Sequence, residues 1–177
     1  MKATRHPATP DELREMLRYD PNTGELFWKI TTRNGKGVAG NRAGSFDKSG
    51  YRKVNVKYRN YLEHRVSWAI HHGMWPSGLL DHINGDGTDN RIANLRPATG
   101  TQNRWNSAAN RNNTTGFKGV TRNGDRFMAQ LQTGGRNKNL GRYKTAEEAS
   151  TAYQRACKEH HGEFAWSGLA DRSDRRS

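Results

Sequence analysis

Residues 79–106 read LLDHINGDGTDNRIANLRPATGTQNRWN, and this is the most informative stretch of the sequence. An apolar pair leads a strand into Asp81 and His82, a polar loop follows, and Asn94 lies where a return strand begins. A capping-box pattern then predicts a helix that carries Asn103 in its first turn. We expect this order of strand, loop, strand and helix to bring Asp81, His82 and Asn103 toward one place.

The three side chains suit metal-assisted hydrolysis. Asp81 and Asn103 offer hard oxygen ligands, which Mg²⁺ or Mn²⁺ prefers. His82 suits a general base, because an unperturbed imidazole has a pKa of roughly 6.5, close to working pH.

The run from Asp81 to Asn103 closely resembles the HNH nuclease motif of phage intron-associated homing endonucleases. Asn94 and Asn103 follow His82 by 12 and 21 residues, which is the spacing of that motif. With the upstream turn Asp20–Gly24, the resemblance extends over about residues 10–106. It implies an α+β fold with a ββα-metal (His-Me finger) core at about residues 79–108.

The resemblance also implies roles for four residues. His82 would activate water, Asp81 and Asn103 would hold one divalent ion, and Asn94 would pin the motif loop through backbone hydrogen bonds. The last position is often His in the family, and here it is Asn103.

A second unit is expected after the Asn-rich stretch 107–115, which we interpret as a linker. Three short strands, at 117–122, 126–133 and 138–143, precede a helix that starts from a capping box at Thr145. The apolar face of this three-stranded antiparallel sheet should pack on the helix. Its other face would be left basic and rich in amides, and a narrow sheet of this kind fits the major groove of DNA.

Residues 116–166 resemble the plant ethylene-response-factor (Apetala-type) DNA-binding domain, which also occurs fused to phage HNH nucleases. Matching pieces include Gly119-Val120, Leu140–Tyr143 and His161-Gly162, whereas Thr121 and Gln132 stand where the plant domains usually have Arg. Sheet docking is therefore implied, but the plant target sequence is not. The residues expected to contact DNA are Arg122, Arg126, Gln130, Gln132, Arg136, Lys138 and Arg142, with Arg104 beside the nuclease site.

Composition agrees with a nucleic-acid partner. The chain of 177 residues has 30 Lys and Arg against 17 Asp and Glu, a formal net charge of +13. Residues 116–144 hold seven Lys or Arg and one Asp, whereas 145–163 hold two Lys or Arg and four Glu. No stretch approaches the ~20 apolar residues of a membrane span, and the single Cys157 excludes an internal disulfide framework and a Cys-rich zinc site.

The expected organisation is a nuclease domain at 1–106, the linker 107–115, a DNA-binding domain at 116–166 and a tail at 167–177. We expect a site-selective, homing-type DNA endonuclease that uses Mg²⁺ or Mn²⁺ and leaves 5′-phosphate and 3′-hydroxyl ends. Its partner is double-stranded DNA, with no membrane and no organic cofactor, and it acts as a monomer or homodimer in the cytoplasm of a bacterial or phage-infected cell.

Two other functions remain open from the residues. One is a noncatalytic DNA-binding regulator on an HNH scaffold, and the other is an RNA-binding accessory protein. His64 is interpreted as a core histidine, and Arg96 as a residue flanking the site. The basic stretch 51–59 with Arg65 is a possible second DNA surface.

Overall fold

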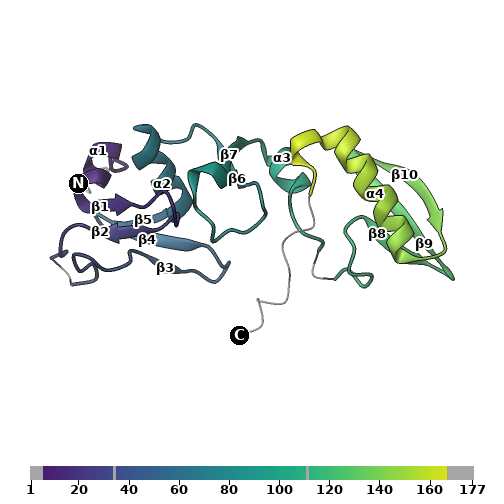
Figure 1. The fold of residues 1–177 in the computed structure, drawn as a ribbon, viewed down its shortest axis with the longest axis horizontal. Helices are drawn as coiled ribbons and strands as arrows, with labels where there is room; N and C mark the ends of the chain where they lie inside the picture. Colours follow the sequence, from purple (N-terminus) through teal and green to yellow (C-terminus); the bar gives the residue numbers. More distant parts are fainter. Residues whose placement is uncertain (1–5, 34, 111, 167–177) are drawn as a thin grey trace, which may run out of the picture. The chain divides into compact units, whose positions relative to one another are not determined.

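The structure, a computed structural model, describes residues 6–33, 35–110 and 112–166. The expected tail at 167–177 lies outside these residues. By their contacts the elements form two compact units, which divide between Thr99 and Gly100. This division comes seven residues before the expected end of the nuclease domain at residue 106. The units are described separately below (Figure 1).

The first unit begins with a helix whose start is encoded locally. Thr9 accepts a hydrogen bond from the Glu12 backbone, the Glu12 carboxylate accepts one from the Thr9 backbone, and Pro10 takes the first helical position. The sequence Thr9-Pro10-Asp11-Glu12 predicts this capping box, and the structure confirms it. The elements are α1 (Pro10–Met16), β1 (Leu17–Tyr19), β2 (Leu26–Trp28), β3 (Ser45–Phe46), β4 (Arg52–Val56), β5 (Arg59–Leu62), α2 (Glu63–His72), β6 (Leu79–His82), the 3₁₀ turn η1 (Ile92–Asn94) and β7 (Leu95–Ala98).

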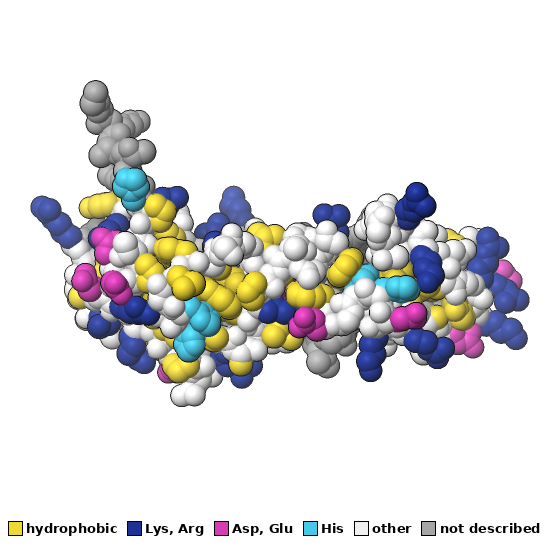
Figure 2. Space-filling view, turned by 90° about the horizontal axis from the view of Figure 1, so that it is seen from above, with side chains coloured by type: hydrophobic (Ala, Val, Ile, Leu, Met, Phe, Trp, Pro, Cys, Tyr) yellow, Lys and Arg dark blue, Asp and Glu magenta, His cyan; other side chains and the backbone are white. Residues whose placement is uncertain are grey.

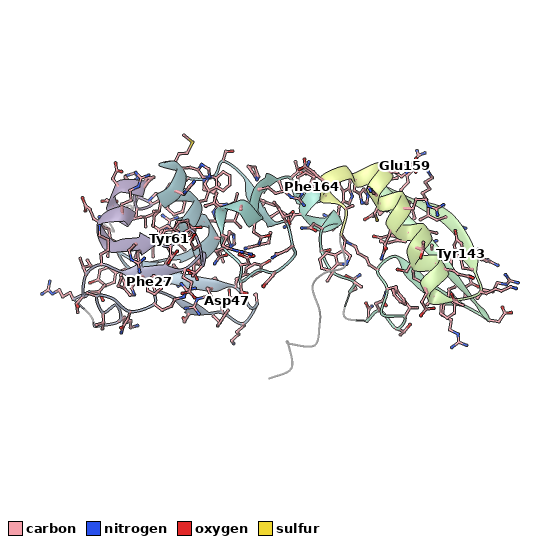
Figure 3. All side chains as sticks on the ribbon, viewed as in Figure 1. Phe27, Asp47, Tyr61, Tyr143, Glu159 and Phe164 are labelled. Carbon is pink, nitrogen blue, oxygen red and sulfur yellow. The ribbon has the colours of Figure 1, made fainter. Side chains whose placement is uncertain are left out.

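Three small antiparallel sheets make up this unit: β1–β2, β3–β4–β5 and β6–β7. Helices α1 and α2 and the first two of these sheets contribute to an apolar core that includes Leu13, Leu26, Val54 and Val66, all fully buried. Tyr61, labelled in Figure 3, packs against this core and stacks on Trp75 at a ring-centroid distance of 5.2 Å. The core is small, as the low apolar content of the chain predicts.

A buried carboxylate ties the middle sheet to α2. Glu63, the first residue of α2, is fully buried and pairs with Arg42 and with Arg52, the latter at 3.0 Å. Its two cationic partners offset the cost of burying its charge.

The sequence placed one turn wrongly. The Arg59-Asn60 pair in the sequence predicts a turn, but the strand reverses two residues earlier, at Lys57 and Tyr58, which have φ values of 50° and 64°. Non-Gly residues rarely adopt positive φ, so composition gives no signal for this turn. The Gly-rich stretch 34–50 likewise predicts a loop, and the short strand β3 lies inside it.

The second unit contains α3 (Gly100–Trp105), β8 (Val120–Asn123), β9 (Arg126–Thr133), β10 (Arg136–Tyr143), α4 (Ala146–His161) and the 3₁₀ turn η2 (Gly162–Phe164). The strands form an antiparallel sheet in the order β10–β9–β8, and α4 packs on one face (Figure 1). Val120, Ala129, Leu131 and Tyr153 form its core. The expected α+β class, with a three-stranded sheet on one helix, is confirmed.

Gly119 allows this close packing. A Cβ atom at Gly119 would lie 2.1 Å from the Tyr153 ring, so no larger residue fits there. Helical spacing from Ala149, Tyr153 and Ala156 predicts His160 on the buried face of α4, but His160 is exposed and His161 is buried instead. The buried face of α4 therefore ends one residue later than the spacing predicts.

Within the stretch 107–115, the described residues Ser107, Asn113 and Thr115 form hydrogen bonds within the second unit. Asn113 donates to the carbonyls of Phe117 and Val120, and its side-chain oxygen accepts from Thr115. The Lys118 ammonium donates to three carbonyls, those of Arg104, Trp105 and Ser107. Burial lowers the pKa of Lys118 to about 8.

Candidate active site

Two paired strands present the Asp81-His82 dipeptide. In the β6–β7 ladder Asp81 lies opposite Arg96 and His82 opposite Leu95. Asp81 and His82 are both buried, with exposed fractions of 4% and 6%. Neighbouring residues of a strand point to opposite faces, so the two side chains meet different neighbours.

Asp81 forms an ion pair across this ladder. Its Oδ2 atom accepts hydrogen bonds from Arg96 Nε at 2.9 Å and from Arg96 Nη2 at 2.8 Å. Arg96, which the sequence placed at the edge of the site, is thus largely buried against the carboxylate.

His82 is held by a residue that the sequence analysis did not single out. Its Nε2 atom lies 3.1 Å from Oδ1 of Asn90, which is 1% exposed. An amide oxygen only accepts hydrogen bonds, so this contact favours the tautomer with hydrogen on Nε2 and the lone pair on Nδ1. Asn90 stands in the polar loop between the strands, and its residue type alone gave no signal of this contact.

The His82 ring also lies in an aromatic group. His64, from α2, meets it edge-on at a centroid distance of 5.1 Å, and Tyr51 lies 6.2 Å from His82 and 5.8 Å from His64. Burial, together with the neighbouring His82 and Arg65, lowers the pKa of His64 to about 3. His64 is therefore a neutral, buried ring at neutral pH, consistent with a core histidine.

Asn94 closes the loop between β6 and β7. Its Oδ1 atom accepts from the Asn84 backbone at 3.0 Å, and its Nδ2 atom donates to the Asn84 side chain and to the Asp89 carbonyl. The Ile83 backbone donates to the Asn94 carbonyl at 2.8 Å. These bonds fix the loop that carries Asn90 at the end of β6.

Asn103 and Arg104 lie on α3, in the second unit, and both are exposed. Asp81, His82 and Asn94 lie in the first unit. Among the described residues, no group of three or more His, Cys, Asp or Glu side chains is placed to hold a metal ion. A carboxylate and a carboxamide are nevertheless oxygen donors of the kind that fits Mg²⁺ or Mn²⁺.

Strand register divides the expected DNA-contacting residues between two faces of the second sheet. Residues directly opposite one another share a face, so the outer face is the one opposite that of buried Ala129 and Leu131. Lys138 pairs with Leu131 and lies 3.1 Å from His160 Nε2 on α4, so it belongs to the helix side. The outer face carries Arg126, Gln130, Gln132 and Arg142, whereas the register puts Arg122, Arg136 and Lys138 on the helix side.

Arg122, Arg136 and Lys138, which we expect to contact DNA, therefore point to the helix side of the sheet and not to its outer face. The reason is that strand pairing, not charge, decides which way a side chain points. The bulge between Asn139 and Gly141 changes the alternation within β10 and brings Arg142 to the outer face. Figure 2 shows Lys and Arg side chains at the surface of this unit, with some Asp and Glu among them.

Basic side chains of the stretch 51–59, and Arg65, form ion pairs and hydrogen bonds within the first unit. Lys53 pairs with Asp47 at 2.7 Å, and Lys57 pairs with Glu12. The Arg65 guanidinium donates to the carbonyls of Gly78 and Pro76. These contacts reduce the charge that this surface can offer to a polyanion.

Comparison with known proteins defines the class. Residues 61–104 match the family model described as HNH endonuclease, so the chain contains an HNH endonuclease domain. Protein 3.8 of Escherichia phage T7 is 31% identical over 111 residues, which make up 61% of this chain and 91% of that protein. The chain belongs to the same family as T7 Protein 3.8.

A solved structure, titled "DNA binding and cleavage by the HNH homing endonuclease I-HmuI", is also similar, with 23% identity and a TM-score of 0.37. The match covers 50% of this chain and 49% of that one, so this chain spans about half the length of the solved protein. No helix within the described ranges is long and apolar enough to cross a membrane.

Proposed function

We propose that the protein is a metal-dependent, homing-type DNA endonuclease in which His82 is the general base. The observation that carries this proposal is the position of His82 within the family match, at the end of β6 and with its Nε2 atom hydrogen-bonded to Asn90. That bond leaves Nδ1 as the nitrogen that takes a proton from water.

The reaction is the hydrolysis of a phosphodiester bond. Water attacks phosphorus as it loses a proton to His82 Nδ1, and the P–O bond to the 3′ oxygen breaks. The 3′ oxygen takes a proton from a second water molecule, which leaves 5′-phosphate and 3′-hydroxyl ends. A positioned base contributes typically ~10²–10⁴-fold to such a rate. Asn94 keeps the loop around His82 closed through its bonds to Asn84 and Asp89.

Asp81 and Asn103 are the proposed ligands of one Mg²⁺ or Mn²⁺ ion, because both present hard oxygen donors. When bound, the ion would stabilise negative charge on the phosphoryl group and the leaving oxygen. In its absence, Arg96 balances the buried charge of Asp81.

DNA binding is proposed for the second unit, through the outer face of the β8–β10 sheet. The sheet-on-helix architecture and the outer-face residues Arg126, Gln130, Gln132 and Arg142 support this docking mode. The likeness to ethylene-response-factor domains supports the same mode, and Arg104 is a proposed phosphate contact. The match to a phage protein supports action in a phage-infected bacterial cell.

Cleavage of supercoiled plasmid DNA tests the proposal. We expect nicked or linear product with Mg²⁺ and none with excess EDTA, and His82→Ala should abolish cleavage while keeping affinity for DNA. Glu15→Ala, an exposed residue of α1 outside the family match, is the control and should cut at the wild-type rate. DNA binding by the wild type without cleavage in either Mg²⁺ or Mn²⁺ would instead indicate a noncatalytic regulator.

A further inference from the structure

Residues outside the nuclease motif contact the loop that holds His82. Tyr19, at the end of β1, donates its hydroxyl hydrogen to the Asn90 carbonyl at 3.1 Å. The same hydroxyl accepts a hydrogen bond from the Ile92 backbone, also at 3.1 Å. One side chain 71 residues away thus fixes the backbone on both sides of Arg91.

The turn that follows β1 packs on the same segment. Gly24 closes this turn with a hydrogen bond to Asp20 and has φ +77°. A Cβ atom at Gly24 would lie 2.5 Å from the backbone nitrogen of Arg91 and 2.7 Å from the carbonyl carbon of Asn90. The backbone of the turn is therefore in direct contact with the residue that binds His82.

These contacts have a chemical consequence at His82. The two neutral tautomers of an imidazole place the basic lone pair on different nitrogens, and the partner of the other nitrogen decides between them. Asn90 is almost fully buried and approaches Nε2 at 3.1 Å. A shift of its backbone would move the acceptor away from the ring.

We propose that Asn90 is the positioning residue that fixes the tautomer and orientation of His82, and that Tyr19 and the Asp20–Gly24 turn hold Asn90 in place. This inference rests on the proposed function of His82 as a general base. It makes the N-terminal turn part of the nuclease site, although that turn lies outside residues 61–104 that match the HNH family.

The first test reads the tautomer directly in the full-length, metal-free protein. Long-range ¹H–¹⁵N spectra at pH 8.5, with the His82 signals assigned by their loss in His82→Gln, should show hydrogen on Nε2. Asn90→Leu removes the acceptor and should give a mixture of tautomers, whereas Asn90→Asp retains an oxygen acceptor and should keep Nε2 protonated. An unchanged Nε2–H tautomer in Asn90→Leu would overturn the proposal.

The second test separates contact with the loop from backbone strain. Gly24→Ala and Gly50→Ala both place alanine at positive φ, but only Gly24 has the loop against it, and a Cβ at Gly50 meets nothing within 4 Å. We expect Gly24→Ala and Asn90→Leu to slow single-turnover cleavage by about 100-fold, with metal-free DNA affinity changed less than about twofold. Gly50→Ala should cut at the wild-type rate, and Asn90→Asp should recover most of the loss.

Equal cleavage rates in Gly24→Ala and Gly50→Ala would contradict the role of the turn. Should Asn90→Leu fail to fold, Gly24→Ala and Asn90→Asp still decide the outcome. A wild-type protein that does not cut DNA would contradict the proposed nuclease function, and the tautomer measurement would still support or overturn the role of Asn90.

Discussion

The Arg96 guanidinium donates two hydrogen bonds to one carboxylate oxygen of Asp81, from Nε at 2.9 Å and from Nη2 at 2.8 Å. The exposed fractions of the two side chains are 11% and 4%. Arg96 therefore balances the buried negative charge of Asp81, the carboxylate that we propose as a ligand of the divalent metal ion.

Replacing Arg96 should make stability depend on divalent metal. In Arg96→Met the Asp81 carboxylate stays buried without its partner, which costs about 3 kcal/mol of unfolding free energy. Saturating Mg²⁺ should restore part of this loss if Asp81 is a ligand, because binding to the folded state alone stabilises it. Urea unfolding with and without Mg²⁺ measures both effects.

Arg91→Met provides the comparison, because Arg91 pairs with Asp89 through an exposed guanidinium. We expect a much smaller loss of stability and no added response to Mg²⁺ in this variant. An equal response of the two variants to Mg²⁺ would count against Asp81 as a metal ligand.

His64 should make the first unit sensitive to acid. Burial lowers its folded pKa to about 3, whereas the unfolded chain binds the proton near pH 6.5. Since the unfolded state then binds more protons between these values, stability is complete above pH 6.5 and falls as the pH drops toward 3. From pH 7.5 to pH 5 the loss due to His64 should be about 2 kcal/mol.

His64→Gln should remove this part of the pH dependence. Urea unfolding of the wild type and of His64→Gln at pH 5, 6 and 7.5 gives their free energies of unfolding. As the pH falls from 7.5 to 5, the wild type should lose more of this free energy than the variant. Parallel stability profiles would show that protonation of His64 is not linked to unfolding.

Local signals predicted most elements of this fold. The capping boxes at Thr9 and Thr145 were both read correctly, because each depends on side chains within one helical turn. Apolar alternation likewise identified Ala129 and Leu131 as the buried face of β9. These features depend on neighbours close in sequence.

Long-range pairing could not be predicted in the same way. Asn90 is an ordinary loop residue in the sequence, and its role appears only once Tyr19 and Gly24 are packed on its backbone. The side of the sheet taken by Lys138 depends on its register with Leu131, which no local pattern specifies. The spacing from His82 to Asn94 indicated the nuclease motif, but not what orients the imidazole.

The outer face of the second sheet should dominate salt-dependent DNA binding. The two outer-face cations, Arg126 and Arg142, should together contribute about −1.8 to the log–log salt slope, from about −0.9 for each neutralised phosphate. Arg142→Gln removes an outer-face cation and should lower the magnitude of the slope by about 0.9. Lys138→Gln removes the same charge from the helix side, where Lys138 contacts His160, and should change the slope less.

Fluorescence-anisotropy titrations at several salt concentrations give these slopes. A larger change for Lys138→Gln than for Arg142→Gln would contradict the outer face as the docking surface. A slope near zero for the wild type would contradict phosphate-driven binding altogether.

Lys118 should determine how firmly α3 is held in the second unit. Its ammonium donates to three carbonyls at the end of this six-residue helix, and Trp105 stacks on His161 at 4.2 Å with the rings 9° apart. A helix this short is not stable alone, so its order depends on these contacts. Lys118→Met leaves the carbonyls without their charged donor and should cost about 2 kcal/mol.

Hydrogen exchange of peptides covering residues 101–107 measures this effect. We expect exchange at least tenfold faster in Lys118→Met, with the amides of α4 little changed. Lys158→Met removes the same charge from an exposed position on α4 and should exchange like the wild type. Because Asn103 is carried by α3, the more mobile helix should also weaken Mn²⁺ binding measured by electron paramagnetic resonance. Faster exchange with unchanged Mn²⁺ affinity would argue against Asn103 as a ligand.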